Sequence, residues 1–186
     1  MKKRLFIRLC FLLGLVSLTT QAQIISVTPG TDFNVVPGTI VSMENLQLTP
    51  SANFTFSGVA LDKTTTTTNI SVIPTIAKYY KFSGTTNAYS GEVLFTYLDA
   101  ELNSFTESSL KLLYHNGTAW FFDDNGTNSP SANAVTSNLS GIPLNELSLG
   151  TGTLQTYYVD ADGDGFGSTV AVQGIAPDRV ARENGS

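Results

Sequence analysis

Cysteine is nearly absent from the 186-residue chain, and its single occurrence, Cys10, lies in an apolar segment near the start. A single cysteine forms no disulfide within the chain. Histidine is equally scarce, because His115 stands alone, so a zinc site built from several His or Cys ligands is excluded. The folded part must therefore be held together by burial of its core, to which a metal bound through oxygen atoms could add.

Positive charge is also in short supply, with 10 Lys and Arg against 15 Asp and Glu. Four of the basic residues lie within residues 1–22, so the remaining chain carries six against 15, a net charge of about −9 with His115 neutral. Nucleic-acid binding needs clustered Lys and Arg, and we therefore expect no nucleic acid as a partner. Anionic membrane surfaces are disfavoured for the same reason.

Long hydrophobic runs are missing except for one short run, Leu9 to Leu18. It follows the basic start Met1-Lys2-Lys3-Arg4 and precedes the small residues Thr20 and Ala22. This order is typical of a secretory signal peptide, and the run is too short to span a bilayer of about 30 Å as a retained anchor. We predict a signal peptide over residues 1–22, a secreted or cell-surface location, and no membrane span after its removal.

Helical periodicity is absent outside the signal, whereas turn residues recur at close intervals. Short β-prone runs are closed by Pro29-Gly30 and Pro37-Gly38. The strongest strands are Lys78 to Phe82 and Glu92 to Leu98, and the second is apolar on both faces, so we expect it to be central. The pattern predicts an all-β fold, a β-sandwich of short antiparallel strands over residues 23–150.

Asn116-Gly117 lies between two β-prone runs and is the clearest hairpin signal. A two-residue loop would require positive φ at both residues and would pair Tyr114 with Ala119. Trp120 then shares a face with Lys111 and His115. That face is either covered by the second sheet or leaves Trp120 exposed to stack on a sugar ring. We assign to the core the opposite face, with Leu110, Leu112, Tyr114, Ala119 and Phe121.

An acidic segment near the end of the chain alternates aspartate with small residues. In a calcium loop, the first, third and fifth positions supply side-chain oxygens, the sixth is Gly, and the seventh supplies a backbone carbonyl. Carboxylates this close repel one another unless a cation lies between them. We predict that calcium is bound by Asp160, Asp162, Asp164, the carbonyl of Phe166, and Ser168 through water. The twelfth position, Ala171, offers no ligand. We predict an acidic calcium-binding loop over residues 151–170 and a flexible tail over residues 171–186.

Residues 156–167 resemble the thrombospondin type 3 calcium repeat. The resemblance depends on the alternating aspartates, on Gly165, and on Tyr157-Tyr158 just before them. It is closest to the short versions found in bacterial secreted, multidomain surface proteins. By this resemblance the segment is a calcium-binding spacer or part of an adhesive stalk.

Catalytic motifs are not found in the sequence, which has no Gly-x-Ser-x-Gly, His-Glu-x-x-His or phosphate-loop pattern. A carboxylate pair of the glycosidase type, drawn from Glu92, Asp99, Glu101 and Glu107, stays open, as does a second cation site at residues 123–126. The leading interpretation is a secreted, non-catalytic cell-surface or adhesion-type module with a calcium-binding linker, whose partner is an extracellular protein or a glycan. The alternative is a carbohydrate-binding module of a secreted degradative enzyme.

Export of the chain should leave a defined N-terminus. Because Thr20 and Ala22 are small residues at the end of the apolar run, we expect cleavage after Ala22. Mass spectrometry of the exported protein should find Gln23 as the first residue. A mature protein that retains Leu9 to Leu18 would contradict the assignment.

Overall fold

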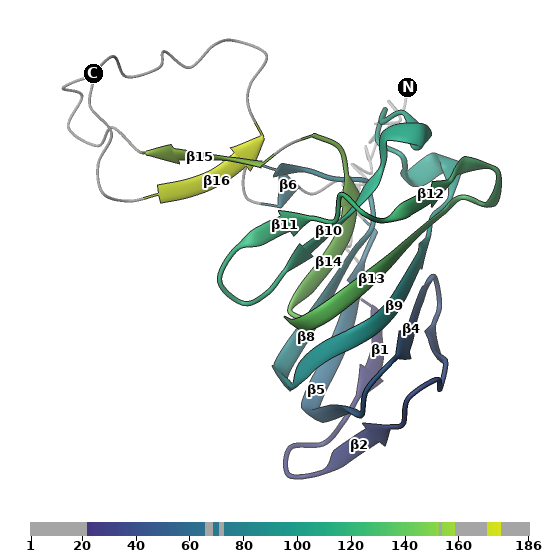
Figure 1. The fold of residues 1–186 in the computed structure, drawn as a ribbon, viewed down its shortest axis with the longest axis vertical. Coiled ribbons are helices and arrows are strands. Elements are labelled where there is room, and N and C mark those ends of the chain that lie inside the picture. The colour runs from purple at the N-terminus through teal and green to yellow at the C-terminus, as the bar shows by residue number, and fades with distance from the viewer. Residues whose placement is uncertain (1–21, 66–68, 71–72, 153, 159–170, 176–186) are drawn as a thin grey trace, which may run out of the picture.

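The computed structural model describes residues 22–65, 69–70, 73–152, 154–158 and 171–175. Strands dominate this part of the chain, and its helical structure consists of the short 3-10 turns η1 (Asp99–Glu101), η2 (Glu107–Ser109) and η3 (Pro130–Ala132). Two antiparallel sheets face each other (Figure 1). The predicted all-β, sandwich-like fold is confirmed.

The larger sheet has seven strands, and its central strands are contributed by distant parts of the chain. β2 (Asp32–Val35) pairs with β5 beside β1. The remaining order across the sheet is β1 (Ala22–Ser26), β5 (Phe54–Thr64), β8 (Tyr79–Thr86), β14 (Glu146–Gly150), β10 (Lys111–His115) and β11 (Trp120–Phe122).

The smaller sheet has five strands in the order β12 (Thr127–Ser129), β13 (Ala134–Pro143), β9 (Ala88–Thr96), β4 (Leu46–Pro50) and β3 (Val41–Met43). The central place predicted for the strand around Glu92 is confirmed, because β9 pairs with β13 on one side and β4 on the other. β13 continues past Leu139 as far as Pro143. It pairs with β9 along its length, with a bulge between Leu139 and Ile142.

Two further pairs of strands lie outside the main sheets. β6 (Asn69–Ile70) pairs with β7 (Ile73–Pro74), and β15 (Leu154–Tyr158) pairs with β16 (Ala171–Ile175). Figure 1 shows the β15–β16 hairpin projecting beside β6 and β11.

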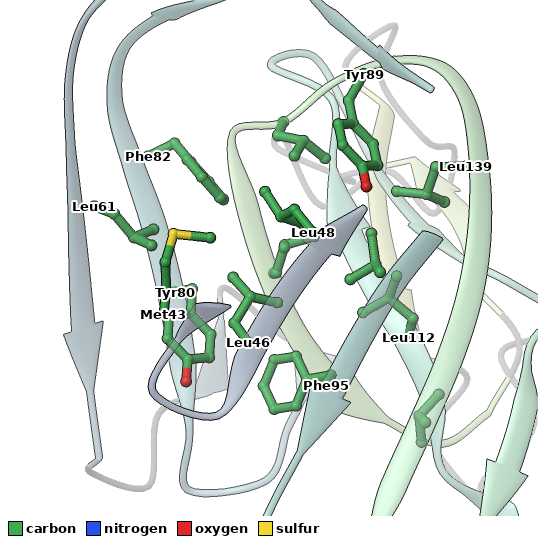
Figure 2. Packing of buried hydrophobic residues seen from close by; sticks show 14 of the residues in the cluster. Met43, Leu46, Leu48, Leu61, Tyr80, Phe82, Tyr89, Phe95, Leu112 and Leu139 are labelled. Carbon is green, nitrogen blue, oxygen red and sulfur yellow. The ribbon is translucent and has the colours of Figure 1, made fainter. Parts of the chain in front are cut away.

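The core lies between the two sheets, where each strand contributes every second side chain. In β4 and β9 buried residues alternate with more exposed ones, as the pleat of a half-buried strand requires. Phe54 meets Phe56 and Tyr89 edge to face, and Tyr80 meets Phe95 in the same way. Figure 2 shows side chains of both sheets meeting in this cluster, among them Leu46, Leu48, Leu61, Phe82, Phe95, Leu112 and Leu139.

Gly91 allows two strands to approach closely. A Cβ atom there would lie 2.7 Å from the Pro50 Cα and would also overlap the Thr49 carbonyl oxygen, and the residue has φ +146°. Any side chain would therefore push β9 away from β4. Glycine at this position lets the central strand pair with β4 as far as Pro50.

A buried ion pair joins the two sheets at one end of the sandwich. Lys78 is fully buried just before β8, and its Nζ lies 2.5 Å from Glu101 Oε2 and donates to the Thr96 carbonyl at 3.1 Å. The same Glu101 oxygen accepts the Leu98 N–H at 2.8 Å. Burial lowers the pKa of Lys78, and the neighbouring Glu101 carboxylate opposes that effect. The pair therefore links β8 to the end of β9, and removal of one partner would leave a buried charge uncompensated.

Alkaline pH should unfold the domain through its tyrosines. Burial raises the pKa of Tyr80 and Tyr89, and also of Tyr79, Tyr97 and Tyr114. A raised pKa contributes stability that is fully present below the unfolded value of about 10 and is lost as pH rises through the folded value. Lys78 acts in the opposite direction, since its lowered pKa adds stability as pH approaches 10.5. The effect of this single lysine is smaller than the combined effect of the five tyrosines.

We therefore expect the free energy of unfolding to fall steadily above about pH 10. Tyrosine ionisation, followed by near-ultraviolet absorbance, should coincide with loss of the β-sheet circular dichroism signal. Reversible titration of all the tyrosines near their ordinary pKa, in a protein that stays folded, would show that these side chains are not buried as described.

Candidate functional site

The predicted calcium ligands Asp160, Asp162, Asp164, Phe166 and Ser168 lie outside the described residues. What the structure describes is the pair of strands on either side of them. β15 and β16 are antiparallel, with Leu154 opposite Ile175 and Tyr158 opposite Ala171. The two ends of the acidic segment therefore start from adjacent positions of one hairpin, held by main-chain hydrogen bonds.

The β15–β16 hairpin lies against the sandwich. β15 contacts β11, and β16 contacts β7. Gly150, where the chain leaves β14, is enclosed: a Cβ atom there would lie 3.1 Å from the Pro74 carbonyl oxygen and 3.3 Å from the Phe122 ring. The predicted boundary at residue 171 falls inside this hairpin, because Ala171–Ile175 returns as β16 beside β15.

The hairpin at Asn116-Gly117 forms, but its predicted register is wrong. Tyr114 pairs with Phe121 and His115 with Trp120, so the loop has four residues instead of two. The reason is the Asn116 side chain, whose Oδ1 accepts the N–H groups of Thr118 at 2.9 Å and Ala119 at 3.0 Å. Of the two central residues expected to have positive φ, only Gly117 does, at +93°.

Trp120 is buried, with 8% of its surface exposed. A register change of two residues leaves each side chain on its predicted face, so Trp120 still shares a face with Leu113. That outer face of the larger sheet is covered by Ile73 of β7 instead of by the second sheet, and Phe122 packs against the same cluster. Trp120 therefore offers no open ring face of the kind that stacks on a sugar.

His115 has a local structural role beside the loop. Its Nδ1 accepts the Gly117 N–H at 3.1 Å, and its ring lies 5.0 Å from that of Trp120. The Asn145 Oδ1 lies 3.1 Å from the same Nδ1. These contacts place His115 beside the turn, where it supports the loop.

Three of the four acidic residues considered for a catalytic pair lie beside separate neighbours. Asp99 Oδ1 accepts from Asn133 Nδ2 at 2.6 Å, and Glu101 pairs with Lys78. Glu107 lies near Tyr97, whose pKa is raised by burial and then by this carboxylate. Glu92 is exposed. Each contact fixes a local segment of the fold, and nothing in these contacts places two of the carboxylates across a shared cleft.

Residues 123–126 form the turn that carries the chain from β11 in the larger sheet to β12 in the smaller one. The Asn125 N–H donates to Asp123 Oδ1 at 3.0 Å, which closes an Asx turn. Lys111 Nζ lies 2.6 Å from Asp124 Oδ1. Over the described part of the chain, no three His, Cys, Asp or Glu side chains are grouped to hold a metal. These contacts favour the plain turn over the second cation site.

A cavity of about 370 Å³ lies at this turn. Its wall includes Lys111, both aspartates of the turn, Asn128 and Gly152, the last of which leads towards β15. Two buried polar atoms near it, Asn128 Oδ1 and Ser137 Oγ, have no hydrogen-bond partner. From the sequence only the turn at residues 123–126 could be predicted. The cavity could not, because the strands that complete it come from separate segments of the chain.

Neither the protein-family models nor the searches of curated proteins and solved structures give a match to this chain. None of the helical segments in the described ranges has the length and apolar character needed to span a bilayer. The sheet topology alone defines the fold class, an all-β, sandwich-like domain with an attached hairpin.

The Asn116–Ala119 loop gives a direct test of its conformation. Gly117 has φ +93°, and no atom lies within 4 Å of the place that a Cβ atom would take, so a side chain there meets backbone strain and no steric clash. Gly117→Val should lower the free energy of unfolding by about 1 kcal/mol or more, measured by denaturant unfolding. Gly117→Asn is the matched control and should cost less, because Asn tolerates positive φ. Equal stability of all three proteins would mean that the loop has another conformation.

Proposed function

We propose that the protein is a secreted, non-catalytic module of a cell surface or adhesion type, with calcium bound by its acidic segment. The observation that supports this most is the pairing of Tyr158 with Ala171. It brings together the two ends of residues 159–170, so that the oxygen atoms of this segment belong to one closed loop. A loop with fixed ends loses less conformational freedom when it binds an ion than an open linker would.

The chemistry of the segment favours calcium. Asp160, Asp162 and Asp164 supply hard carboxylate oxygens, and Phe166 supplies a carbonyl. Calcium accepts six to eight oxygen ligands in flexible geometry, whereas magnesium demands a near-ideal octahedron and gives up water reluctantly. Ala171 cannot supply the chelating carboxylate of a full calcium loop, so water would complete the coordination. We expect a Kd of about 0.1–1 mM, in the range of extracellular modules.

The proposed secreted location also follows from the sequence, through the basic start, the short apolar run and the small residues at its end. An extracellular module with no disulfide needs a complete core of its own. The main core cluster runs from Val35 to Leu149 and draws side chains from both sheets of the sandwich. We therefore expect the sandwich to stay folded whether or not calcium is bound.

The alternative, a carbohydrate-binding module with Trp120 as its platform, loses the feature that would have supported it. The Trp120 ring is buried under Ile73 and Leu113. An extracellular protein or a glycan stays the proposed partner, and a glycan would have to bind elsewhere on the surface.

Isothermal titration calorimetry on the secreted protein tests the calcium proposal. We expect binding heat at millimolar calcium, with a Kd of about 0.1–1 mM, and at least a tenfold weaker Kd for Asp162→Ala, since one carboxylate ligand is lost. Asp124→Ala is the matched control: it removes one carboxylate from the sandwich, where Asp124 pairs with Lys111. Equal heats for wild type and Asp162→Ala, or no binding at millimolar calcium, would overturn the proposal.

A further inference from the structure

The loop between β10 and β11 contains a chemically reactive pair, Asn116-Gly117. Where Gly follows Asn, the Gly amide nitrogen can attack the carbonyl carbon of the Asn side chain, because no side chain on the Gly hinders the approach. The attack forms a succinimide ring and releases ammonia. The described part of the chain has a second pair of this kind, Asn125-Gly126, so the surroundings of each pair decide which one reacts.

The side-chain oxygen of Asn116 lies against two hydrogen-bond donors. Its Oδ1 accepts the Thr118 N–H at 2.9 Å and the Ala119 N–H at 3.0 Å. Attack on the neighbouring carbon would turn this oxygen into an oxyanion, and N–H groups at about 2.7–3.1 Å stabilise such an ion. The two donors that close the loop are therefore also placed to assist attack on the side-chain carbon.

A histidine contacts the attacking nitrogen. His115 Nδ1 accepts the Gly117 N–H at 3.1 Å, so the imidazole touches the proton that must leave when this nitrogen forms a new bond. A general base acts from within hydrogen-bond reach, about 2.6–3.2 Å. Asn145 Oδ1 lies 3.1 Å from the same Nδ1, and it can accept a hydrogen bond from that nitrogen once the proton is there.

The loop also leaves room for the reaction. Gly117 is exposed and has φ +93°, and no atom lies within 4 Å of the place that a Cβ atom would take. Asn116 is half-buried. A ring formed here meets no crowding beside Gly117, and solvent can reach it for hydrolysis.

The second pair has different surroundings. The Asn125 N–H donates to Asp123 Oδ1. A Cβ atom on Gly126 would lie 2.8 Å from Ser137 Oγ, so the main chain is crowded on that side. The one histidine of the chain lies at the other loop. The same dipeptide therefore occurs here without an imidazole and with less space.

We propose that Asn116 is a self-modifying site, at which the loop promotes its own deamidation. His115 takes the amide proton of Gly117, the Gly117 nitrogen bonds to Asn116 Cγ, and the side-chain nitrogen of Asn116 leaves with that proton as ammonia. Water then adds to one of the two ring carbonyl carbons and breaks its bond to the ring nitrogen. The product is an aspartate or an isoaspartate at this position, and water is the only other reactant.

The two products affect the hairpin differently. An aspartate can keep the contacts to the N–H groups of Thr118 and Ala119 and strengthen them, since a charged acceptor forms stronger hydrogen bonds. An isoaspartate inserts a methylene group into the main chain before Gly117 and changes the spacing of the loop. Either product adds a negative charge to the tip of the hairpin.

Peptide mapping by mass spectrometry, on protein stored at neutral pH and physiological temperature, tests the proposal. We expect Asn116 to deamidate about tenfold faster or more in the folded protein than in the same protein unfolded in guanidinium chloride, and to exceed Asn125 by a similar factor. His115→Gln should slow the reaction about tenfold or more, because a general base contributes roughly 10²–10⁴-fold. Thr118→Ala keeps the backbone N–H and is the matched control, with an unchanged rate.

The direction of the His115→Gln effect separates catalysis from a structural role. If His115 only held the loop in place, its replacement would free the Asn-Gly pair and leave the rate unchanged or faster, and that result overturns the proposal. Slowing by Thr118→Ala, or a rate at Asn116 no faster than at Asn125, overturns it as well.

The comparison of folded and unfolded wild type needs no variant, so it decides the proposal even if a variant does not fold. A folded protein that deamidates at Asn116 no faster than the unfolded chain contradicts the assignment. Since neither calcium nor a partner enters the reaction, the outcome is independent of the function proposed above.

Discussion

The fold depends on the apolar side chains that its two sheets bury between them. With one cysteine in the chain, no disulfide shares this task. The core must therefore be continuous, and a single cluster does run from Val35 near the start of the sandwich to Leu149 at its last strand. Close packing of rings such as Phe54, Tyr80 and Phe95 gives this core its shape, since each meets a neighbour edge to face.

Polar contacts also connect the two sheets outside the apolar core. At one end, the buried Lys78–Glu101 pair joins β8 to the segment after β9. Where the chain crosses between the sheets, Asp123 Oδ1 accepts the Asn125 N–H within the turn, and Asn128 Nδ2 donates to the Glu107 and Leu110 carbonyls. Such buried polar groups stabilise the fold only when they are satisfied, as both amide hydrogens of Asn128 are.

The regular parts of this fold are predictable from the sequence because they depend on local alternation and on turn residues. β9 shows this, since apolar residues on both of its faces are enough to indicate a central strand. The full length of β13 is not evident from the sequence, because the residues after Leu139 include the turn-prone Gly141 and Pro143. That length comes from pairing with β9, and a single sequence does not reveal such long-range pairing.

The candidate sites show the same division between local and long-range information. The hairpin at Asn116 is located correctly, but its register depends on how the Asn116 side chain caps Thr118 and Ala119. Trp120 is buried by Ile73, which belongs to a separate short hairpin, so neither its burial nor the cavity near Asn128 can be predicted from neighbouring residues. The acidic alternation is visible in the sequence, and its placement between two paired strands is not.

The central claim is that a self-sufficient sandwich carries a calcium-binding hairpin loop. Hydrogen-exchange mass spectrometry, with the protein in millimolar calcium and again in EDTA, tests it most directly. The account predicts slower exchange in calcium for peptides that cover residues 154–175 and unchanged exchange in the core strands β4, β8 and β9. Unchanged exchange over residues 154–175, or a core that loses protection in EDTA, would contradict it.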